Sequence, residues 1–295
     1  MKARGRGATH KGLKREGNED AYLVDNDNGL YVVCDGMGGH AAGEVASEKA
    51  VQVVSRIMGE NRGVIQQARE GRVPVGQMES LAQSVLQTAC REIYDLATSN
   101  PKLAGMGTTM TLLMHIQDRA IMAHVGDTRL YLLRGGEVHQ LSTDHTMVNE
   151  LIRNGTMGAE DAMNSPFAHV LARSISTHPS VQVDTLNLEL LSGDRFVLCT
   201  DGLHDHLTDP EMLYEQMGDE FDQMAQQLVL FANDSGGHDN ATAVIVEVWD
   251  RERTSDHLSP RDTMVSNKMH ALSANFLFED LSLAQLSRVL DLCEI

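Results

Sequence analysis

The sequence is poor in aromatic residues and in positive charge, and each shortage is informative. Aromatic side chains make up 4% of the 295 residues, so we expect many of the 16 methionines to fill the core. The formal net charge of −18 argues against a general nucleic-acid binder, because affinity for phosphate backbones comes from Lys and Arg clusters. One basic stretch without acids, residues 1–15, is predicted to be a solvated arm or an edge strand.

Cysteine motifs and long apolar runs are also absent. Cys34, Cys90, Cys199 and Cys293 form no C-x-x-C pair, so we expect reduced, buried thiols rather than a zinc knuckle or disulfides. None has Arg six positions later, which excludes the usual cysteine-nucleophile phosphatase loop, and no P-loop motif occurs. Without the apolar segment of a signal peptide or a run of about 18 apolar residues, nothing is expected to enter a membrane, and the protein is predicted to be cytoplasmic.

Apolar periodicity predicts the secondary structure. Two strands flank a polar turn within residues 20–34, and helices are expected at 44–59 and 78–98, where apolar residues recur at helical spacing. Residues 107–141 instead have the pattern of successive strands in a meander. The remaining predicted elements are a short helix at 146–153, strands within 181–190 and 194–202, helices at 209–217 and 221–234, and a closing strand at 241–249.

Strands dominate this pattern, and the helices come in pairs rather than alternating with single strands. We therefore predict an α+β fold with layered antiparallel sheets, not a doubly wound α/β fold. The segment from Ser142 to Pro179 is a long, irregular insert between strands. Inserts of that kind are often functional.

Acidic residues recur where apolar strands begin or end. Asp35, Asp127 and Asp201 each follow an apolar run, and Asp20 and Asp239 each precede one. Any one Asp beside Gly or Asn is typical of an ordinary turn. Strand ends of one sandwich converge on one edge, however, and each close carboxylate pair would repel by about 4 kcal/mol at an effective dielectric constant near 20. A bound cation would make such a cluster tolerable.

The chemistry of these ligands indicates which cation. Oxygen ligands without a His or Cys cluster favour Mg²⁺ or Mn²⁺ over zinc. A calcium-binding EF-hand is disfavoured, because its ligands lie within one loop, whereas these run from Asp20 to Asp239. Two such ions can activate a bridging water and clamp a phosphoryl group. Arg15 could then hold the phosphate bidentately, although a lone Arg in a basic arm is more often a surface charge.

Six segments carry a family resemblance. They are R-x-x-N-E-D (15–20), D-G-M-G-G-H-A-A-G-E (35–44), G-T-T (107–109), G-D-T-R (126–129), T-D-G-L-H-D (200–205) and H-D-N-A-T (238–242). In this order they resemble the motif series of the metal-dependent PPM/PP2C-type protein Ser/Thr phosphatases, especially the prokaryotic ones. The resemblance spans residues 5–250 and implies a sandwich of two antiparallel β-sheets flanked by helix pairs, with the metal centre at one end.

The resemblance implies a dinuclear Mn²⁺ or Mg²⁺ centre. Asp35 would bridge both ions and Asp201 and Asp239 would hold one of them, while the backbone carbonyl of Gly36 would bind the other. Hydrolysis of phosphoserine or phosphothreonine would then proceed by direct attack of a metal-bridging hydroxide, without a phosphoenzyme. The substrates implied are phosphorylated proteins, the targets of a Ser/Thr kinase.

The resemblance also implies roles for residues around the ions. Asp20 and Glu19 would orient metal-bound waters, and Arg15 would bind the substrate phosphate. The insert 142–179 corresponds to the family's flap, which borders the site and influences substrate choice. The residues that match a third, weaker metal site are Asp127, Asp201 and Asp205.

Two departures from the family pattern affect these expectations. Eukaryotic members place a His, proposed as the general acid, directly after the D-G of the second segment, where this chain has Met37. His40 is the nearest titratable candidate, although a His in a Gly-rich loop is more often a structural or substrate contact. The flap sequence N-S-P-F-A-H-V-L-A-R-S-I-S-T matches the family loosely, which leaves substrate specificity open.

A polar segment and a helix follow the predicted catalytic domain, residues 1–250. Residues 251–275 are predicted to be a linker and 276–295 an amphipathic helical tail, with Ser282 and Gln285 as a capping box. The apolar helix face would dock on the catalytic domain or on a second copy. The tail is also similar to the entry helix of cyclic-nucleotide-binding domains, as if it began a truncated regulatory domain, but the phosphate-binding part of such a domain is absent from the sequence.

Two alternatives to a general protein phosphatase share parts of this pattern. A catalytically silent relative could bind phosphoproteins or act as a scaffold, but it would not need a complete set of metal ligands. A phosphatase dedicated to one small regulatory protein would share the chemistry and differ only in its substrate.

Overall fold

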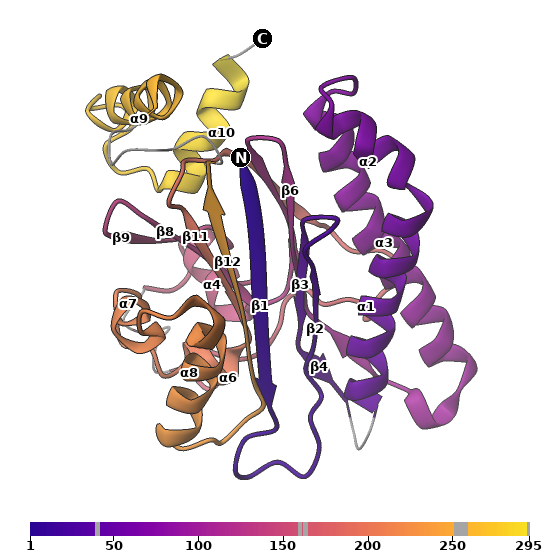
Figure 1. The fold of residues 1–295 in the computed structure, drawn as a ribbon. Coiled ribbons are helices and arrows are strands. Elements are labelled where there is room, and N and C mark those ends of the chain that lie inside the picture. Colours follow the sequence, from indigo (N-terminus) through magenta and orange to yellow (C-terminus); the bar gives the residue numbers. More distant parts are fainter. Residues whose placement is uncertain (39–41, 159–160, 162–164, 251–258, 294–295) are drawn as a thin grey trace.

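A computed structural model describes residues 1–38, 42–158, 161, 165–250 and 259–293. Two five-stranded antiparallel sheets lie face to face, with helices on both outer faces (Figure 1). The first sheet has the order β1 (Lys2–His10), β12 (Ala241–Trp249), β11 (Arg195–Cys199), β8 (Arg129–Arg134), β9 (Glu137–Gln140). The second has the order β10 (Asp184–Glu189), β7 (Arg119–Val125), β6 (Met110–Ile116), β3 (Leu30–Cys34), β2 (Ala21–Asp25). A short pair joins β4 (Gly36–Met37) to β5 (Gly107–Thr108). The predicted α+β sandwich is confirmed.

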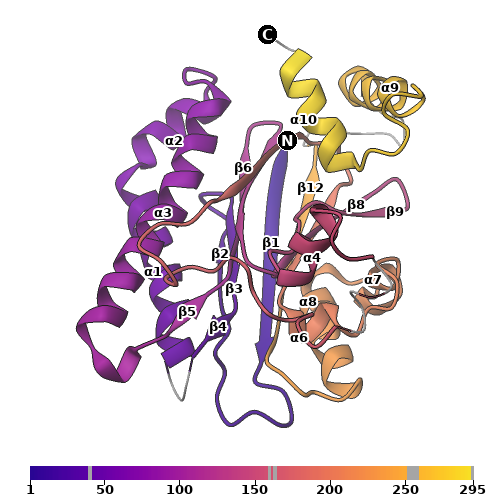
Figure 2. The ribbon, with the colours of Figure 1, turned by 180° about the vertical axis from the view of Figure 1, so that it is seen from behind.

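Helices form the two outer layers, as the view from behind also shows (Figure 2). Against the second sheet lie α1 (Ala42–Glu60), α2 (Arg62–Arg69) and α3 (Val75–Ser99), followed by a 3₁₀ turn, η1 (Pro101–Leu103). Against the first sheet lie α6 (Asp201–His204), α7 (Met212–Met217) and α8 (Phe221–Asp234). The insert contains α4 (Met147–Arg153). In the part of the chain that the structure describes, no helix is both long enough and apolar enough to cross a bilayer.

The four layers explain why the central strands are continuous apolar runs. All five residues of β3 are buried. Because side chains alternate across a strand, Tyr31 and Val33 pack between the sheets, whereas Leu30, Val32 and Cys34 face α1 and α3. β12 divides its residues in the same way between the inter-sheet core and α8. Strands buried on both faces lack the polar alternation that marks a sheet with one wet face.

Most predicted elements are present, but α2, α9 and a few short elements were wrong or missed. The basic residues 2–10 form edge strand β1, which pairs with β12 from Lys2 opposite Trp249 to His10 opposite Ala241. The polar helix α2 was not predicted. Residues 251–275 were predicted to be a linker, but α9 (Pro260–Ser273) lies within them. Ser259 caps this helix by accepting a hydrogen bond from the Asp262 amide, and Pro260 occupies its first turn.

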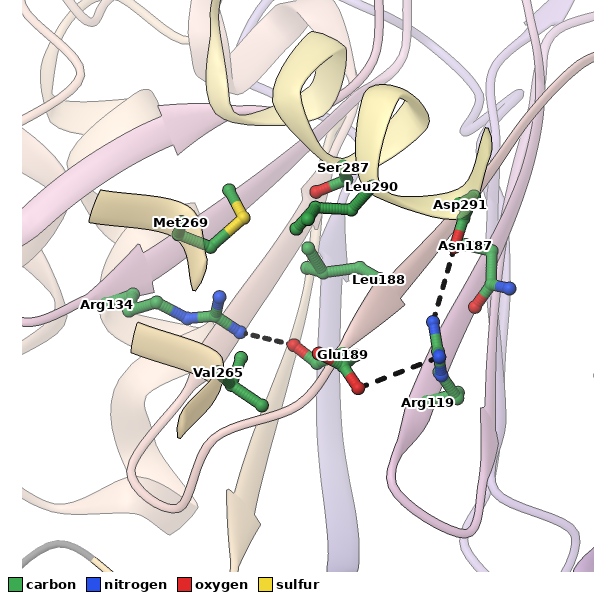
Figure 3. Close-up of a pocket in the computed structure, with 10 residues that line it drawn as sticks. All are labelled: Arg119, Arg134, Asn187, Leu188, Glu189, Val265, Met269, Ser287, Leu290 and Asp291. Atoms are coloured by element: carbon green, nitrogen blue, oxygen red, sulfur yellow. Dashed lines mark hydrogen bonds and ion pairs between the residues drawn. The ribbon is translucent and has the colours of Figure 1, made fainter. Parts of the chain in front are cut away.

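The C-terminal helix α10 (Leu283–Cys293) docks on the edge strand β10 at the upper end of the sandwich in Figure 1. Its predicted capping box is present: Gln285 Oε1 accepts from the Ser282 amide at 2.8 Å, and the Gln285 amide donates to Ser282 Oγ. Ala284 and Leu286 are buried. Figure 3 shows Arg119 of β7 bridging Asp291 of α10 and Glu189 of β10 beneath the helix. The apolar face therefore has a partner within its own chain.

Candidate active site

The strand ends bring most of the predicted site residues into one cleft of about 440 Å³, at the end of the sandwich where β4 lies (Figure 1). Asp20 is buried beside this cleft, and Asp205 lines an adjoining cavity of about 640 Å³. His40 lies outside the described residues. The predicted residues that line the cleft are Arg15, Glu19, Asp35, Gly36, Asp127, Asp201 and Asp239.

The backbone of Asp35 is fixed by the G-T-T segment. The Asp35 amide donates to Thr109 Oγ1, and its carbonyl accepts from the Thr109 amide and from Thr108 Oγ1, all within 2.9 Å. β4 then pairs with β5, so the chain turns sharply as it leaves β3. A Cβ at Gly36 would lie 2.2 Å from the carbonyl oxygen of Gly43, which explains why this position must be glycine. These contacts fix the backbone of Asp35, whose side chain lines the cleft.

Asp20 has one carboxylate oxygen satisfied and one left over. Its Oδ2 accepts from Thr200 Oγ1 at 2.9 Å and from Thr242 Oγ1 at 2.6 Å, whereas its buried Oδ1 has no hydrogen-bond partner. Burial, and then the neighbouring Asp201 and Asp239 carboxylates, raise the pKa of Asp20 to about 7 against the lowering effect of the two threonines. A buried carboxylate oxygen without a donor costs free energy unless a cation or proton meets it.

Asp35 and Asp201 are also buried close to other carboxylates. Burial, followed by the charges of Asp20, Asp201 and Asp127, raises the pKa of Asp35 well above its usual range. Burial likewise raises the pKa of Asp201, whose Oδ1 is buried without a hydrogen-bond partner. Like charges at close range favour the neutral form unless a cation compensates them.

Asp127 and Asp205 differ in environment although they are neighbours. Burial and the charge of Asp201 raise the pKa of Asp127 to about 7, and His204 Nε2 donates to the Asp127 carbonyl at 3.0 Å. For Asp205, burial opposes ionisation, but His204 and His169 outweigh it and lower its pKa. His169 Nδ1 lies 3.6 Å from Asp205 Oδ2 and also lines the acidic cleft, so this histidine connects the cleft with the adjoining cavity.

Arg15 is the cation at the mouth of the cleft. Its guanidinium lies 2.6 Å from Asp239 Oδ2, with its side chain half exposed. Burial acts to lower the pKa of Arg15, but Asp239 raises it above its ordinary value. Burial also raises the pKa of Glu19, against the lowering charge of Arg15. The amide of Asn240 donates to Asp239 Oδ1 at 2.7 Å, so both oxygens of Asp239 are engaged.

The insert forms one wall of the cleft and is tied to the sheets by a polar network. His169, Leu171, Ser174 and Thr177 line the cleft from this side. Behind them, Arg173 bonds to Asp184 Oδ1 at 3.0 Å and lies within 3.2 Å of Glu150. The other insert residue in the network is His145, which accepts from the Gly126 amide at 3.1 Å and lies 3.2 Å from Asp184. The wall is thus anchored next to the Gly126–Asp127 turn.

Sequence reasoning missed the supporting hydroxyls and amides. Thr200 and Thr242 bind Asp20, and Thr9 joins Thr242 at 2.7 Å between their hydroxyl oxygens. Asn240 binds the loop that carries Arg15 and Glu19. Thr200, Asn240 and Thr242 could have been identified because they lie in the T-D-G and H-D-N-A-T segments beside Asp201 and Asp239, whereas Thr9 has no such signal.

The residues present have the chemistry of a site for hard divalent cations. The donors are carboxylates and a backbone carbonyl, and two of the carboxylate oxygens are buried without partners. Across the described residues, no three His, Cys, Asp or Glu side chains are already gathered as a ligand set. The cleft therefore contains ligands that suit a hard divalent cation.

Comparison with known proteins identifies the family. The family model described as Protein phosphatase 2C matches residues 4–240. The serine/threonine phosphatase stp of Listeria innocua is 35% identical over 245 residues, which cover 81% of this chain and 93% of that protein. This chain belongs to the protein phosphatase 2C family.

Solved structures agree with the sequence relatives. The crystal structure of the Mycobacterium tuberculosis serine/threonine phosphatase PstP/Ppp superposes with a TM-score of 0.74 at 31% identity, covering 85% of this chain and all of that one. The catalytic domain of PstP in complex with two manganese ions gives a TM-score of 0.71 at 32% identity, covering 84% and 99% of the two chains.

Proposed function

We propose that this chain hydrolyses phosphoserine and phosphothreonine in proteins, with divalent cations bound in the acidic cleft. The observation that carries the proposal is the meeting of Asp20, Asp35, Asp201 and Asp239 at one end of the sandwich with Arg15 at its mouth. Family membership and the names of the relatives support the same reaction.

Asp35, Asp201, Asp239 and the carbonyl of Gly36 are the ligands we assign to two ions, Mn²⁺ or Mg²⁺. The manganese pair in the related PstP structure supports this assignment. When bound, such ions activate a water as the nucleophile and neutralise charge on the phosphoryl group. The residues assigned to a third, weaker site are Asp127, Asp201 and Asp205.

The remaining site residues act on the substrate and on water. Arg15, half exposed and paired with one carboxylate, can exchange Asp239 for a phosphate that presents the same bidentate geometry. Asp20 and Glu19 accept hydrogen bonds from water and so orient it beside Asp35. His40, which remains the nearest titratable candidate for the general acid, lies outside the described residues. The insert 142–179 supplies the surface that selects the substrate protein.

A silent scaffold is the less supported alternative. A binding module would gain nothing from buried carboxylates that repel one another, because each raises the free energy of the folded state. A phosphatase dedicated to one small regulatory protein would have the same active site. It would differ from a general protein phosphatase only in its substrate.

Hydrolysis of p-nitrophenyl phosphate and of a phosphothreonine peptide tests the proposal directly. We expect turnover with Mn²⁺ or Mg²⁺, none with excess chelator, and little for Asp201→Asn. Equal rates in all three conditions would contradict an enzymatic role. Comparing the peptide with intact phosphoproteins then separates a general phosphatase from a dedicated one.

A further inference from the structure

The loop of residues 11–19, between β1 and β2, carries two of the proposed site residues but has little packing of its own. Most of its side chains are exposed, including that of Arg15. Near its start, the amides of Leu13 and Lys14 donate to the carbonyl of Gly237. At its end, the Glu19 carbonyl accepts from the Gly36 amide at 3.1 Å and from Ser47 Oγ at 2.5 Å. Between these two ends the loop is exposed, and an exposed segment samples many conformations unless further contacts fix it.

One buried side chain binds this loop at three points. Asn240 is 5% exposed and lies between Asp239 and the first residue of β12. Its Oδ1 accepts from the Glu19 amide at 2.8 Å, and its Nδ2 donates to the carbonyls of Lys11 and Gly17, both at 2.9 Å. The contacts therefore reach both ends of the loop, and Arg15 lies between them.

Only a carboxamide can make this set of contacts from a side chain of this size. It offers two donors and an acceptor, whereas a carboxylate offers acceptors alone. The backbone of Asn240 packs closely against Gly202 in α6, because a Cβ at Gly202 would lie 2.0 Å from the backbone carbonyl oxygen of Asn240.

We propose that Asn240 is a positioning residue that fixes loop 11–19, so that Arg15 and Glu19 face the metal-binding carboxylates. It touches neither substrate nor reacting atoms and acts through the loop. The effect on phosphate binding rests on the proposed function, whereas the effect on the loop does not.

The chain contains a matched control at the other end of β1. Asn26, in the turn between β2 and β3, also clamps backbone with its carboxamide: Oδ1 accepts from the Gly5 amide at 2.6 Å and Nδ2 donates to the Gly5 carbonyl at 3.3 Å. Asn26→Asp removes the same donor as Asn240→Asp but lies far from the cleft along the strand. Asn240→Ser and Asn26→Ser form a second matched pair.

Amide hydrogen exchange in the metal-free protein tests the loop directly. We expect exchange at residues 11–20 to rise at least about tenfold in Asn240→Asp and Asn240→Ser, because buried hydrogen bonds are lost. Exchange in β6 and β7 should stay unchanged, and neither Asn26 variant should affect the loop. Unchanged loop exchange, or an equal rise throughout the sheets, would overturn the proposal.

A double-mutant cycle with Arg15 tests the consequence for the site. Alone, Asn240→Ser should raise KM for p-nitrophenyl phosphate and Ki for inorganic phosphate about tenfold. In an Arg15→Ala background the same change should have less than about a twofold effect, because the group being positioned is gone. Equal factors in both backgrounds would overturn the positioning role. Absence of hydrolysis by the wild type would count against the proposed function and leave the exchange result standing.

Discussion

The two ends of the sandwich treat their acidic residues in opposite ways. At the tail end, each of several carboxylates has an arginine: Asp194 pairs with Arg134 at 2.6 Å, and Asp118 pairs with Arg261 at 2.9 Å. Arg119 likewise reaches Glu189 and Asp291, as Figure 3 shows. At the cleft end, the carboxylates of Asp20, Asp35 and Asp201 act on one another, and burial and this mutual repulsion raise their pKa values.

This difference separates stability from function within one fold. At the tail end, the ion pairs named above join α9, α10 and the sheets to one another. Carboxylates that lie close together at the cleft end are stabilised when a cation binds or when one of them takes up a proton. Carboxylates that repel one another at the cleft end indicate a functional site there. Selection for stability alone would favour pairing each of them with a basic side chain.

The strongest test removes a carboxylate from each end. Asp35→Asn should lower kcat for p-nitrophenyl phosphate by about 10³-fold or more, because the ligand expected to bridge the ions loses its charge. Asp118→Asn, at the tail end, should leave kcat unchanged. Steady-state kinetics with saturating Mn²⁺ would measure both. A loss smaller than about tenfold for Asp35→Asn would contradict its assigned role.

The stability of the metal-free protein should depend on pH through the buried carboxyl group of Asp20 at the cleft end. The pKa of Asp20 is about 7 in the fold and about 3.9 when unfolded, so the folded state binds the extra proton between these values. Its contribution to stability is full below about pH 4 and is lost as pH rises through 7, by up to about 4 kcal/mol.

Thermal melting from pH 5 to 8 with chelator would measure this loss. The melting temperature of the wild type should fall with rising pH relative to that of Asp20→Asn. Added Mn²⁺ should reduce the difference, because the cation replaces the proton. Parallel curves for the two proteins, with Asp118→Asn as the control, would show that Asp20 does not titrate in this range.

Substitutions in the C-terminal helix α10 should change the free energy of unfolding without changing the rate of hydrolysis. Leu286 is 5% exposed, so Leu286→Ala should lower the free energy of unfolding by about 2–4 kcal/mol. Leu292, on the same helix, is 72% exposed, and Leu292→Ala should change it by less than about 0.5 kcal/mol. Urea unfolding would measure both, with kcat and KM unchanged. An equal effect of the two substitutions would argue against docking of α10 in solution.

The smallest expected effect concerns the capping box. Ser282→Ala removes the acceptor for the Gln285 amide and should cost about 0.5–1 kcal/mol. Ser80→Ala, an exposed position inside α3, should be neutral or slightly stabilising, because Ala favours helix interiors. Urea midpoints that move equally for both variants would show that the cap contributes nothing.

Sequence alone predicted the elements whose pattern is local. The long helices and β12 have strong periodicity, and the prediction for β12 matches its bounds of 241–249. Convergence of the aspartates followed from their positions at strand ends, because antiparallel pairing brings those ends to one edge. The helices α2 and α9 were missed because their apolar pattern is weak. Helix α2 is short and polar, and α9 has no apolar stripe. Its cap and the Arg261–Asp118 ion pair fix α9 instead.

Contacts between distant residues could not be predicted from local pattern. Arg15 was expected to be available for phosphate, but in the structure it pairs with Asp239, 224 positions away. The three hydrogen bonds of Asn240 likewise depend on the packing of β12 against the loop after β1. The tertiary fold determines such hydrogen-bond partners. The sequence shows that Asn240 is polar, but it does not show which backbone groups Asn240 binds.

The pairing of β1 with β12 has a consequence during synthesis. Among the described residues, β1 pairs in its sheet with a strand more than 230 positions later, because His10 lies opposite Ala241 and Lys2 lies opposite Trp249. A nascent chain that has not yet exposed β12 lacks both this pairing and Asp239. We therefore expect a chain that ends before β12 to lack a complete cleft, because the partner of β1 and one cleft carboxylate are both missing.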